Sequence, residues 1–194
     1  MKSRLYGIIK DVLIIAFFST VFYVLTHNPL VRPEPFISKG LWSIELHQKP
    51  LALGIAGHNY LVLRDDGGKI LFTLHGLPTD ENTGKWKYIG RTKQDILKVW
   101  KFGEDDEGEM RAASYGVSLL KTNKEEALSR WTQAEECGKM IDAKSIPYPP
   151  FGVAVRKDTE NSNSVAYTLA SCMNLKTSHV GLFTPGWGKN LLEN

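Results

Sequence analysis

An uncharged, apolar segment near the N-terminus constrains this chain more than any other feature. Asp, Glu, Lys and Arg are all absent from Val12 to Val31, and the part from Val12 to Leu25 consists mostly of large apolar residues. A helix needs about 20 such residues to cross the hydrocarbon core of a bilayer, where it satisfies its own backbone hydrogen bonds. Pro29 and Pro33 would end such a helix. The segment therefore predicts a single membrane-spanning helix.

The basic residues around this segment indicate its orientation. Lys2, Arg4 and Lys10 precede it, whereas Arg32 alone follows closely. Basic residues collect on the cytoplasmic side of spanning helices, so we expect a cytoplasmic N-terminus and an extracytoplasmic domain. A cleaved signal peptide is the alternative. The run THNPLVRP after the apolar part lacks the small residues of a cleavage site, which favours an uncleaved, single-pass anchor.

The rest of the chain is electrically balanced. Of the 24 basic and 21 acidic residues, 20 of each follow residue 32. A neutral domain is not drawn to a phosphate backbone, so we expect the lipid bilayer as a partner and no nucleic acid. A hydrophobic content of 42% can build one core of ordinary size. We expect a membrane anchor at 1–31, a linker at 32–40 and one domain at 41–194.

Turn residues and side-chain alternation predict that strands precede helices in this domain. Residues 58–77 read as a hairpin, because two strand-like runs flank an Asp-Gly-Gly turn. One helix is expected from about residue 123 to 144 and another at 161–174. Further strands are expected at residues 41–48, 110–120 and 152–156. This order is typical of an α+β domain, with an antiparallel sheet packed on helices.

A further short helix is expected at residues 92–103. Thr92 and Asp95 have the spacing of a capping box, and Gly103 would end the helix.

Two histidines and one serine form a candidate catalytic set. His58 opens the first strand of the hairpin, and His75 lies near the end of the second. With a tight turn around Gly67, the two residues would face each other across the hairpin. One imidazole could then act as a base while the other fixes its tautomer through a hydrogen bond.

Ser162 lies at the predicted start of the last helix, within the run NSNS. The unpaired backbone N–H groups and the dipole of a helix N-terminus stabilise developing negative charge. A serine hydroxyl also needs an adjacent base before it can attack a carbonyl. The set therefore contains the parts of acyl-group chemistry, with the helix N-terminus as part of an oxyanion hole. An ordinary helix cap is the alternative interpretation of NSNS.

The order of these motifs resembles circularly permuted papain-like proteins, namely the lecithin–retinol acyltransferase-like proteins and the permuted desumoylating isopeptidases. In the acyltransferase group a His begins one strand, a second His follows on the next, and an Asn-Cys pair opens a late helix. The runs GHNYLVL, FTLHGL and NSNSVAYTL correspond to these in residues 54–175. The resemblance implies a permuted papain-like fold, with Ser162 as nucleophile, His58 as general base and His75 as orienting residue.

This sequence departs from those families because serine stands where they have cysteine. Ser164 is an alternative nucleophile, although it would point some 200° around the helix from Ser162. The leading hypothesis is a membrane-anchored hydrolase or acyltransferase that acts on an ester or amide carbonyl of a lipid or peptide substrate. The alternatives are a catalytically inactive papain-like binding module at the membrane surface and an unrelated α+β fold.

The remaining candidates are the two cysteines and a possible metal site. Cys137 and Cys172 are too few for a disulfide framework; one disulfide is an option for an extracytoplasmic domain, but two buried thiols are favoured. A zinc site from His47, His58 and His75 has no supporting carboxylate or cysteine spacing. We therefore expect no metal and no cofactor.

Overall fold

The computed structural model describes part of the chain. The described residues are 40–51, 56–90, 92, 94–104, 106, 115–150, 160–177 and 181–193. They belong to the second of two compact units, residues 33–194. The predicted membrane segment and the strand expected at 152–156 lie outside them. Within the described residues, no helix combines the length and apolarity that crossing a membrane requires.

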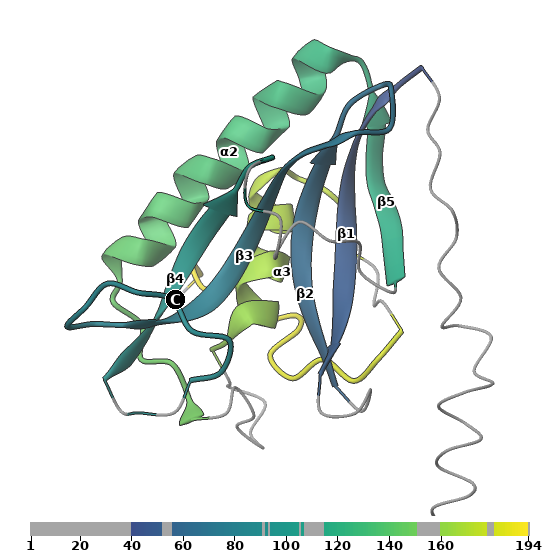
Figure 1. Cartoon of the computed structure of the whole chain (residues 1–194). Coiled ribbons are helices and arrows are strands. Elements are labelled where there is room, and N and C mark those ends of the chain that lie inside the picture. Colours follow the sequence, from purple (N-terminus) through teal and green to yellow (C-terminus); the bar gives the residue numbers. More distant parts are fainter. Residues whose placement is uncertain are drawn as a thin grey trace, which may run out of the picture. The chain divides into compact units, whose positions relative to one another are not determined.

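The domain is built on one five-stranded antiparallel sheet with the strand order β4-β3-β2-β1-β5 (Figure 1). Its strands are β1 (Trp42–Leu51), β2 (Ala56–Arg64), β3 (Ile70–Asp80), β4 (Asp95–Phe102) and β5 (Tyr115–Thr122). The first four strands pair with their neighbours in the chain, whereas β5 crosses over to pair with β1.

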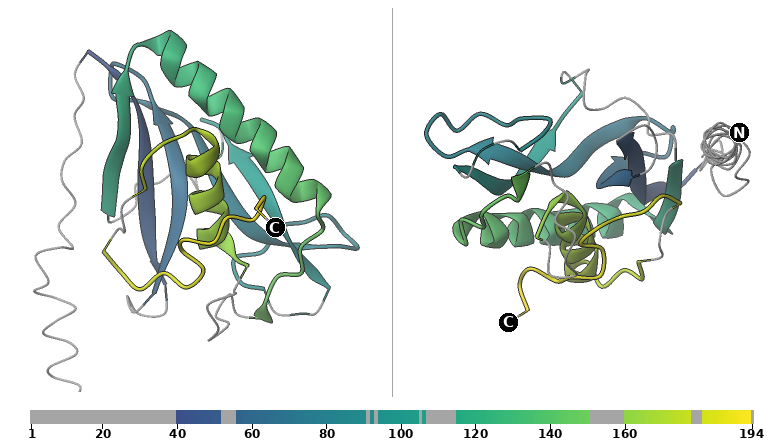
Figure 2. Two further views of the ribbon diagram at one scale, coloured as in Figure 1. Left: turned by 180° about the vertical axis from the view of Figure 1, so that it is seen from behind. Right: turned by 90° about the horizontal axis from the view of Figure 1, so that it is seen from below.

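Two helices cover one face of this sheet, as the end-on view in Figure 2 shows. Helix α2 (Lys124–Ala143) packs mainly on β4, β1 and β5, and helix α3 (Ser162–Cys172) packs on β2 and β3. The core between the layers includes Leu46 and Leu61 from the sheet and Val165 and Leu169 from α3. These helices and the early strands confirm the predicted α+β class.

The helix expected at 92–103 is wrong, because Asp95–Phe102 is strand β4. The capping interaction itself forms: the Thr92 hydroxyl donates to Asp95 Oδ1 at 2.9 Å. It closes a turn, and the chain then pairs with β3 from Asp80↔Asp95 to Thr73↔Phe102. A strand rich in β-branched and aromatic residues gains more from this pairing than from an isolated helical turn.

The hairpin of β2 and β3 forms, but its register differs from the prediction. A bulge between Leu63 and Arg64 shifts the pairing, so that Leu61 lies opposite Leu74. This register places Tyr60, rather than His58, opposite His75. The expectation that the two histidines face each other directly is therefore wrong by two residues, and they are diagonal neighbours.

A disulfide joins the two helices. Cys137 of α2 and Cys172 of α3 are bonded, with Cα atoms 6.6 Å apart. The favoured expectation of two free thiols is therefore wrong. Nothing in the sequence spacing indicated that the two helices would lie against each other at these positions.

Candidate active site

The two histidines of the hairpin form a hydrogen-bonded pair. His58 Nε2 lies 3.0 Å from His75 Nδ1, and His75 Nε2 lies 3.1 Å from the Thr73 hydroxyl. The ring of Tyr60 stacks on that of His75, with centroids 4.2 Å apart. The contact between the imidazoles that the hairpin predicted is thus confirmed, although it runs diagonally between the strands.

Burial keeps both imidazoles neutral at pH 7. It lowers the pKa of His58 to about 4, and the charge of Lys49 adds to this effect. Burial also lowers the pKa of His75 well below its ordinary value, with smaller effects from His58 and Lys49. Each ring therefore carries one N–H and one lone pair, and the pair can pass a proton along the Thr73–His75–His58 chain.

The start of α3 is a fully formed cap. Asn161 Oδ1 accepts hydrogen bonds from the backbone N–H groups of Asn163 (2.9 Å) and Ser164 (3.3 Å), and Ser164 Oγ accepts one from Asn161 N. These two backbone donors are occupied within the helix cap. The expectation that the N-terminus of α3 supplies oxyanion-hole donors is therefore wrong for the N–H groups of Asn163 and Ser164.

Three of the four NSNS side chains also hold the C-terminal PGWG turn. Asn161 and Asn163 each donate to the carbonyl oxygen of Pro185, at 2.9 and 3.0 Å. Ser164 Oγ donates to Gly186 O at 3.0 Å, and this serine is fully buried. These contacts give Ser164 an architectural role, which does not fit the alternative nucleophile.

Ser162 differs from its neighbours because its hydroxyl bonds to Tyr148. The two hydroxyl oxygens are 3.1 Å apart, and both residues are buried. Burial raises the pKa of Tyr148, and the hydrogen bond to Ser162 lowers it in part, so this phenol is neutral at pH 7. Among the described residues, no hydrogen bond joins Ser162 to His58 or His75. No sequence pattern pointed to Tyr148, which follows a proline in a connecting segment.

The first turn of α3 lies against the two strands that carry the histidines. Asn163 Oδ1 accepts from Asn59 N at 2.8 Å. A Cβ placed on Gly76 would lie 2.7 Å from Val165 Cβ and 3.0 Å from Ser162 Cα, so the glycine permits this close approach. Strand alternation turns Asn59 and Gly76 toward α3.

The same alternation turns the side chains of His58 and His75 toward the other face of the sheet. Ser162 and the histidine pair thus flank the same segments of β2 and β3 from opposite sides.

A second polar cluster lies on the histidine face and was missed in the sequence. Glu45 accepts hydrogen bonds from His47 Nε2 (2.6 Å), Arg64 Nε (2.9 Å) and Ser43 Oγ (2.7 Å). Burial alone would raise the pKa of Glu45, but these hydrogen bonds and the Arg64 charge lower it to about 2. His47 is therefore bound to a carboxylate.

Within the described ranges, no group of three His, Cys, Asp or Glu side chains could hold a metal ion.

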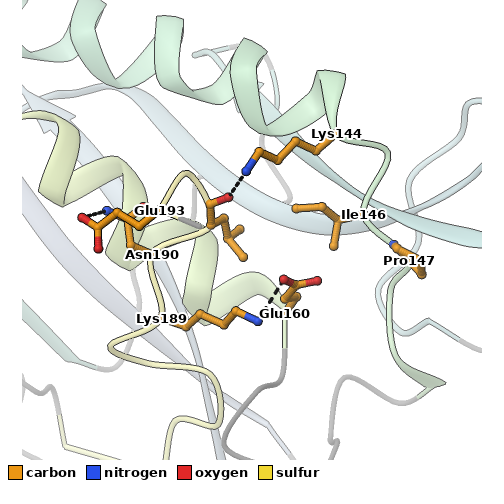
Figure 3. Close-up of a pocket in the computed structure, with 8 residues that line it drawn as sticks. Lys144, Ile146, Pro147, Glu160, Lys189, Asn190 and Glu193 are labelled. Carbon is orange, nitrogen blue, oxygen red and sulfur yellow. Dashed lines mark hydrogen bonds and ion pairs between the residues drawn. The ribbon is translucent and has the colours of Figure 1, made fainter.

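A hollow of about 630 Å³ opens beside the start of α3 (Figure 3). Figure 3 shows charged side chains around it. Lys189 pairs with Glu160 at 2.9 Å, and Lys144 donates to Leu191 O at 2.7 Å. Ile146, Pro147, Asn190 and Glu193 complete its lining. None of the three predicted catalytic residues lines this hollow, although Ile146 and Pro147 lead directly to Tyr148.

No family model, no curated protein and no solved structure matches this chain.

Proposed function

We propose that this chain is a membrane-anchored hydrolase or acyltransferase of permuted papain-like fold that acts on an ester or amide carbonyl. The observation that carries the proposal is the His58–His75 hydrogen bond, at 3.0 Å, on the strands against which α3 presents Ser162. A buried neutral imidazole whose second partner is another imidazole has the arrangement of an oriented general base.

His58 and Ser162 lie on opposite faces of the sheet, and the printed pairing of β2 with β3 ends at Leu61↔Leu74. The proposed reaction therefore requires that, when substrate binds, the Ser162 hydroxyl leaves Tyr148 and meets His58 through the interval between the two strands beyond this pair. Ser162 Oγ attacks the carbonyl carbon while His58 takes the hydroxyl proton. The tetrahedral intermediate then expels the alcohol or amine, which takes that proton from His58. Water or an acceptor alcohol repeats these steps and releases the acyl group. His75 is a positioning residue, because it acts through His58.

The disulfide between Cys137 and Cys172 supports the proposed location outside the cytoplasm. Disulfides persist in oxidising compartments and are rare in the cytosol. The neutral domain and the basic N-terminus fit the same orientation, in which the anchor holds the domain close to the outer surface of the bilayer. A lipid ester and a peptide amide both remain within the proposed substrate class.

Replacement of the proposed nucleophile tests this function. The full chain in detergent micelles is assayed against a panel of lipid esters and peptide amides, as wild type and as Ser162→Ala. Ser171→Ala is the matched control, since its hydroxyl bonds to Tyr167 O at the other end of the same helix. We expect Ser162→Ala to abolish hydrolysis while the domain stays folded, with a stability loss of about 1–3 kcal/mol because the buried Tyr148 hydroxyl loses this hydrogen bond, and we expect Ser171→Ala to retain hydrolysis. Hydrolysis by Ser162→Ala at the wild-type rate would contradict the mechanism.

The second candidate is a catalytically inactive binding module at the membrane surface. The Tyr148–Ser162 hydrogen bond and the capped start of α3 favour it, because both hold the serine in a closed, unreactive arrangement. A binding module would give no hydrolysis in the wild type or in either variant.

A further inference from the structure

The side-chain amide of Asn59 is a buried donor without a partner. Asn59 is fully buried, and its Nδ2 atom forms no hydrogen bond within the described structure. A buried polar group that lacks a partner destabilises the folded state. Most buried side-chain polar atoms are bonded, so an exception of this kind calls for a physical reason.

The neighbouring hydrogen bonds fix which end of this amide is unpartnered. Gln48 Oε1 accepts a hydrogen bond from the backbone N–H of Leu182 at 2.8 Å, which identifies the other atom of the Gln48 amide as Nε2. Gln48 Nε2 then donates to Asn59 Oδ1 at 2.8 Å. Since Oδ1 is the acceptor in this chain, the remaining atom of the Asn59 amide carries the two N–H donors.

The Gln48 side chain is itself held in place. It lies directly over Gly57, where an added Cβ would come within 2.6 Å of Gln48 Cγ. The close contact with Gly57 and the hydrogen bond from Leu182 N fix the orientation of the Gln48 amide. Because Gln48 Nε2 donates to Asn59 Oδ1, the orientation of the Asn59 amide is fixed as well. The Asn59 N–H groups are therefore pre-oriented before any ligand binds.

Asn59 also lies between the two halves of the proposed site. It directly follows His58 in β2, and its backbone N–H donates to the side chain of Asn163, the residue after Ser162. Its own side chain points toward the α3 side of the sheet, which is the side of Ser162. The N–H groups of Asn163 and Ser164, which would otherwise serve this helix as anion donors, are taken up by the Asn161 cap.

We propose that the Asn59 side-chain amide is the oxyanion donor of this site. This inference rests on the proposed function. As Ser162 Oγ bonds to the carbonyl carbon, the carbonyl π electrons move to its oxygen, and Asn59 Nδ2–H donates to that oxyanion. The electrons return when the alcohol or amine leaves, and no proton passes to or from the amide. An unpartnered, pre-oriented donor is suited to charge that develops only in the transition state.

A fluorophosphonate probe tests the assignment, because it phosphonylates a reactive serine and passes through a comparable anionic arrangement at its phosphoryl oxygen. The full chain in detergent micelles is compared as wild type, Asn59→Asp and Asn59→Leu. Asp keeps the oxygen that accepts from Gln48 and removes both N–H donors, whereas Leu removes the whole amide. Asn82→Asp, at an exposed turn, is the matched control. Urea unfolding shows which variants are folded.

We expect both Asn59 variants to label Ser162 about 100-fold more slowly than wild type, at an unchanged probe concentration for half-maximal rate, and Asn82→Asp to label normally. Oxyanion-donor losses of this size appear in the rate constant rather than in binding. Labelling of wild type and a folded Asn59 variant at equal rates would overturn the inference and leave the proposed function intact. Wild type that resists labelling would overturn both.

Discussion

His58 Nε2 lies 3.0 Å from His75 Nδ1, although the two residues are not opposite each other in the sheet. Tyr60 takes the position opposite His75, and the imidazoles meet along the diagonal. Because the second nitrogen of His75 contacts Thr73, the two rings and the hydroxyl form one chain of hydrogen bonds. The proton positions along this chain are coupled, so changes at His75 alter His58.

The first prediction concerns this coupling. His75→Gln should lower kcat about 10- to 100-fold and leave KM nearly unchanged, because it removes the partner that fixes the His58 tautomer. His58→Gln should cost more, within the range of about 10²- to 10⁴-fold that general base catalysis supplies. Steady-state kinetics on the ester panel measure both. His47→Gln is the matched histidine control, and equal losses in all three variants would point to a general structural effect.

The second prediction concerns stability in acid. The folded-state pKa of His58 is about 4, below the ordinary 6.5, so the unfolded chain binds more protons between these values. Stability should therefore fall as pH drops from 6.5 toward 4, by roughly 3 kcal/mol from His58. Urea unfolding at pH 7, 5.5 and 4 measures this fall. His58→Gln should make the dependence less steep without removing it, because the lowered pKa of His75 adds a loss as the pH falls below 6.5. An equally steep dependence in that variant would show that His58 does not contribute.

A further loss should follow at lower pH from Glu45. Its folded-state pKa is about 2 instead of 4.5, so its contribution is complete above pH 4.5 and disappears as the pH falls through 2. Glu45→Gln should remove this second part of the acid dependence and leave the part between pH 6.5 and 4 in place. A wild-type curve that is flat below pH 4.5 would contradict the assignment.

The fourth prediction concerns the disulfide. Cys137 and Cys172 are 35 residues apart in sequence, and closing a loop of that length stabilises the folded state by about 3–4 kcal/mol in the chain-entropy account. The double variant Cys137→Ala/Cys172→Ala should unfold at a correspondingly lower urea concentration. A reductant should shift the wild-type midpoint to a similar extent and leave that of the double variant unchanged. A shift of the urea midpoint by reductant in the double variant would show that the shift does not come from this disulfide.

The fifth prediction concerns the close contact between β3 and α3. Gly76→Ala should destabilise the domain by about 1–3 kcal/mol and impair activity, because the new Cβ would overlap Val165 and press on the backbone of Ser162. Gly103→Ala is the control, since its Cβ would meet nothing closer than Phe72 at 3.9 Å. The urea midpoints of unfolding and the kcat values of the two variants measure both effects. Equal stability of the two variants would mean that the first turn of α3 shifts away from β3 at little cost in free energy.

Much of the fold follows from local sequence patterns. Alternation and the Asp-Gly-Gly turn predicted the β2–β3 hairpin, and the helix expected from about residue 123 to 144 is α2. Strand β4 was mistaken for a helix because the Thr92–Asp95 interaction closes a helix start and a turn equally well. Pairing with β3, a long-range effect, decides between them.

The site was predictable only in part. The histidine pair was found because its members belong to one hairpin, whereas Tyr148 reaches Ser162 from a segment without regular pattern. The Glu45 cluster left a signal that was not used, since Ser43, Glu45 and His47 alternate on one face of a predicted strand. Its partner Arg64 lies 19 residues away, beyond the reach of local patterns.

Peptide mapping after fluorophosphonate labelling tests the central claim most directly. The full chain is labelled in detergent micelles as wild type, Ser162→Ala and His58→Gln, and the modified residue is located by mass spectrometry. The account predicts a phosphonyl group on Ser162 in wild type, none in Ser162→Ala, and strongly slowed labelling in His58→Gln. Wild type with an unmodified Ser162, or His58→Gln that is labelled as fast as wild type, would contradict it.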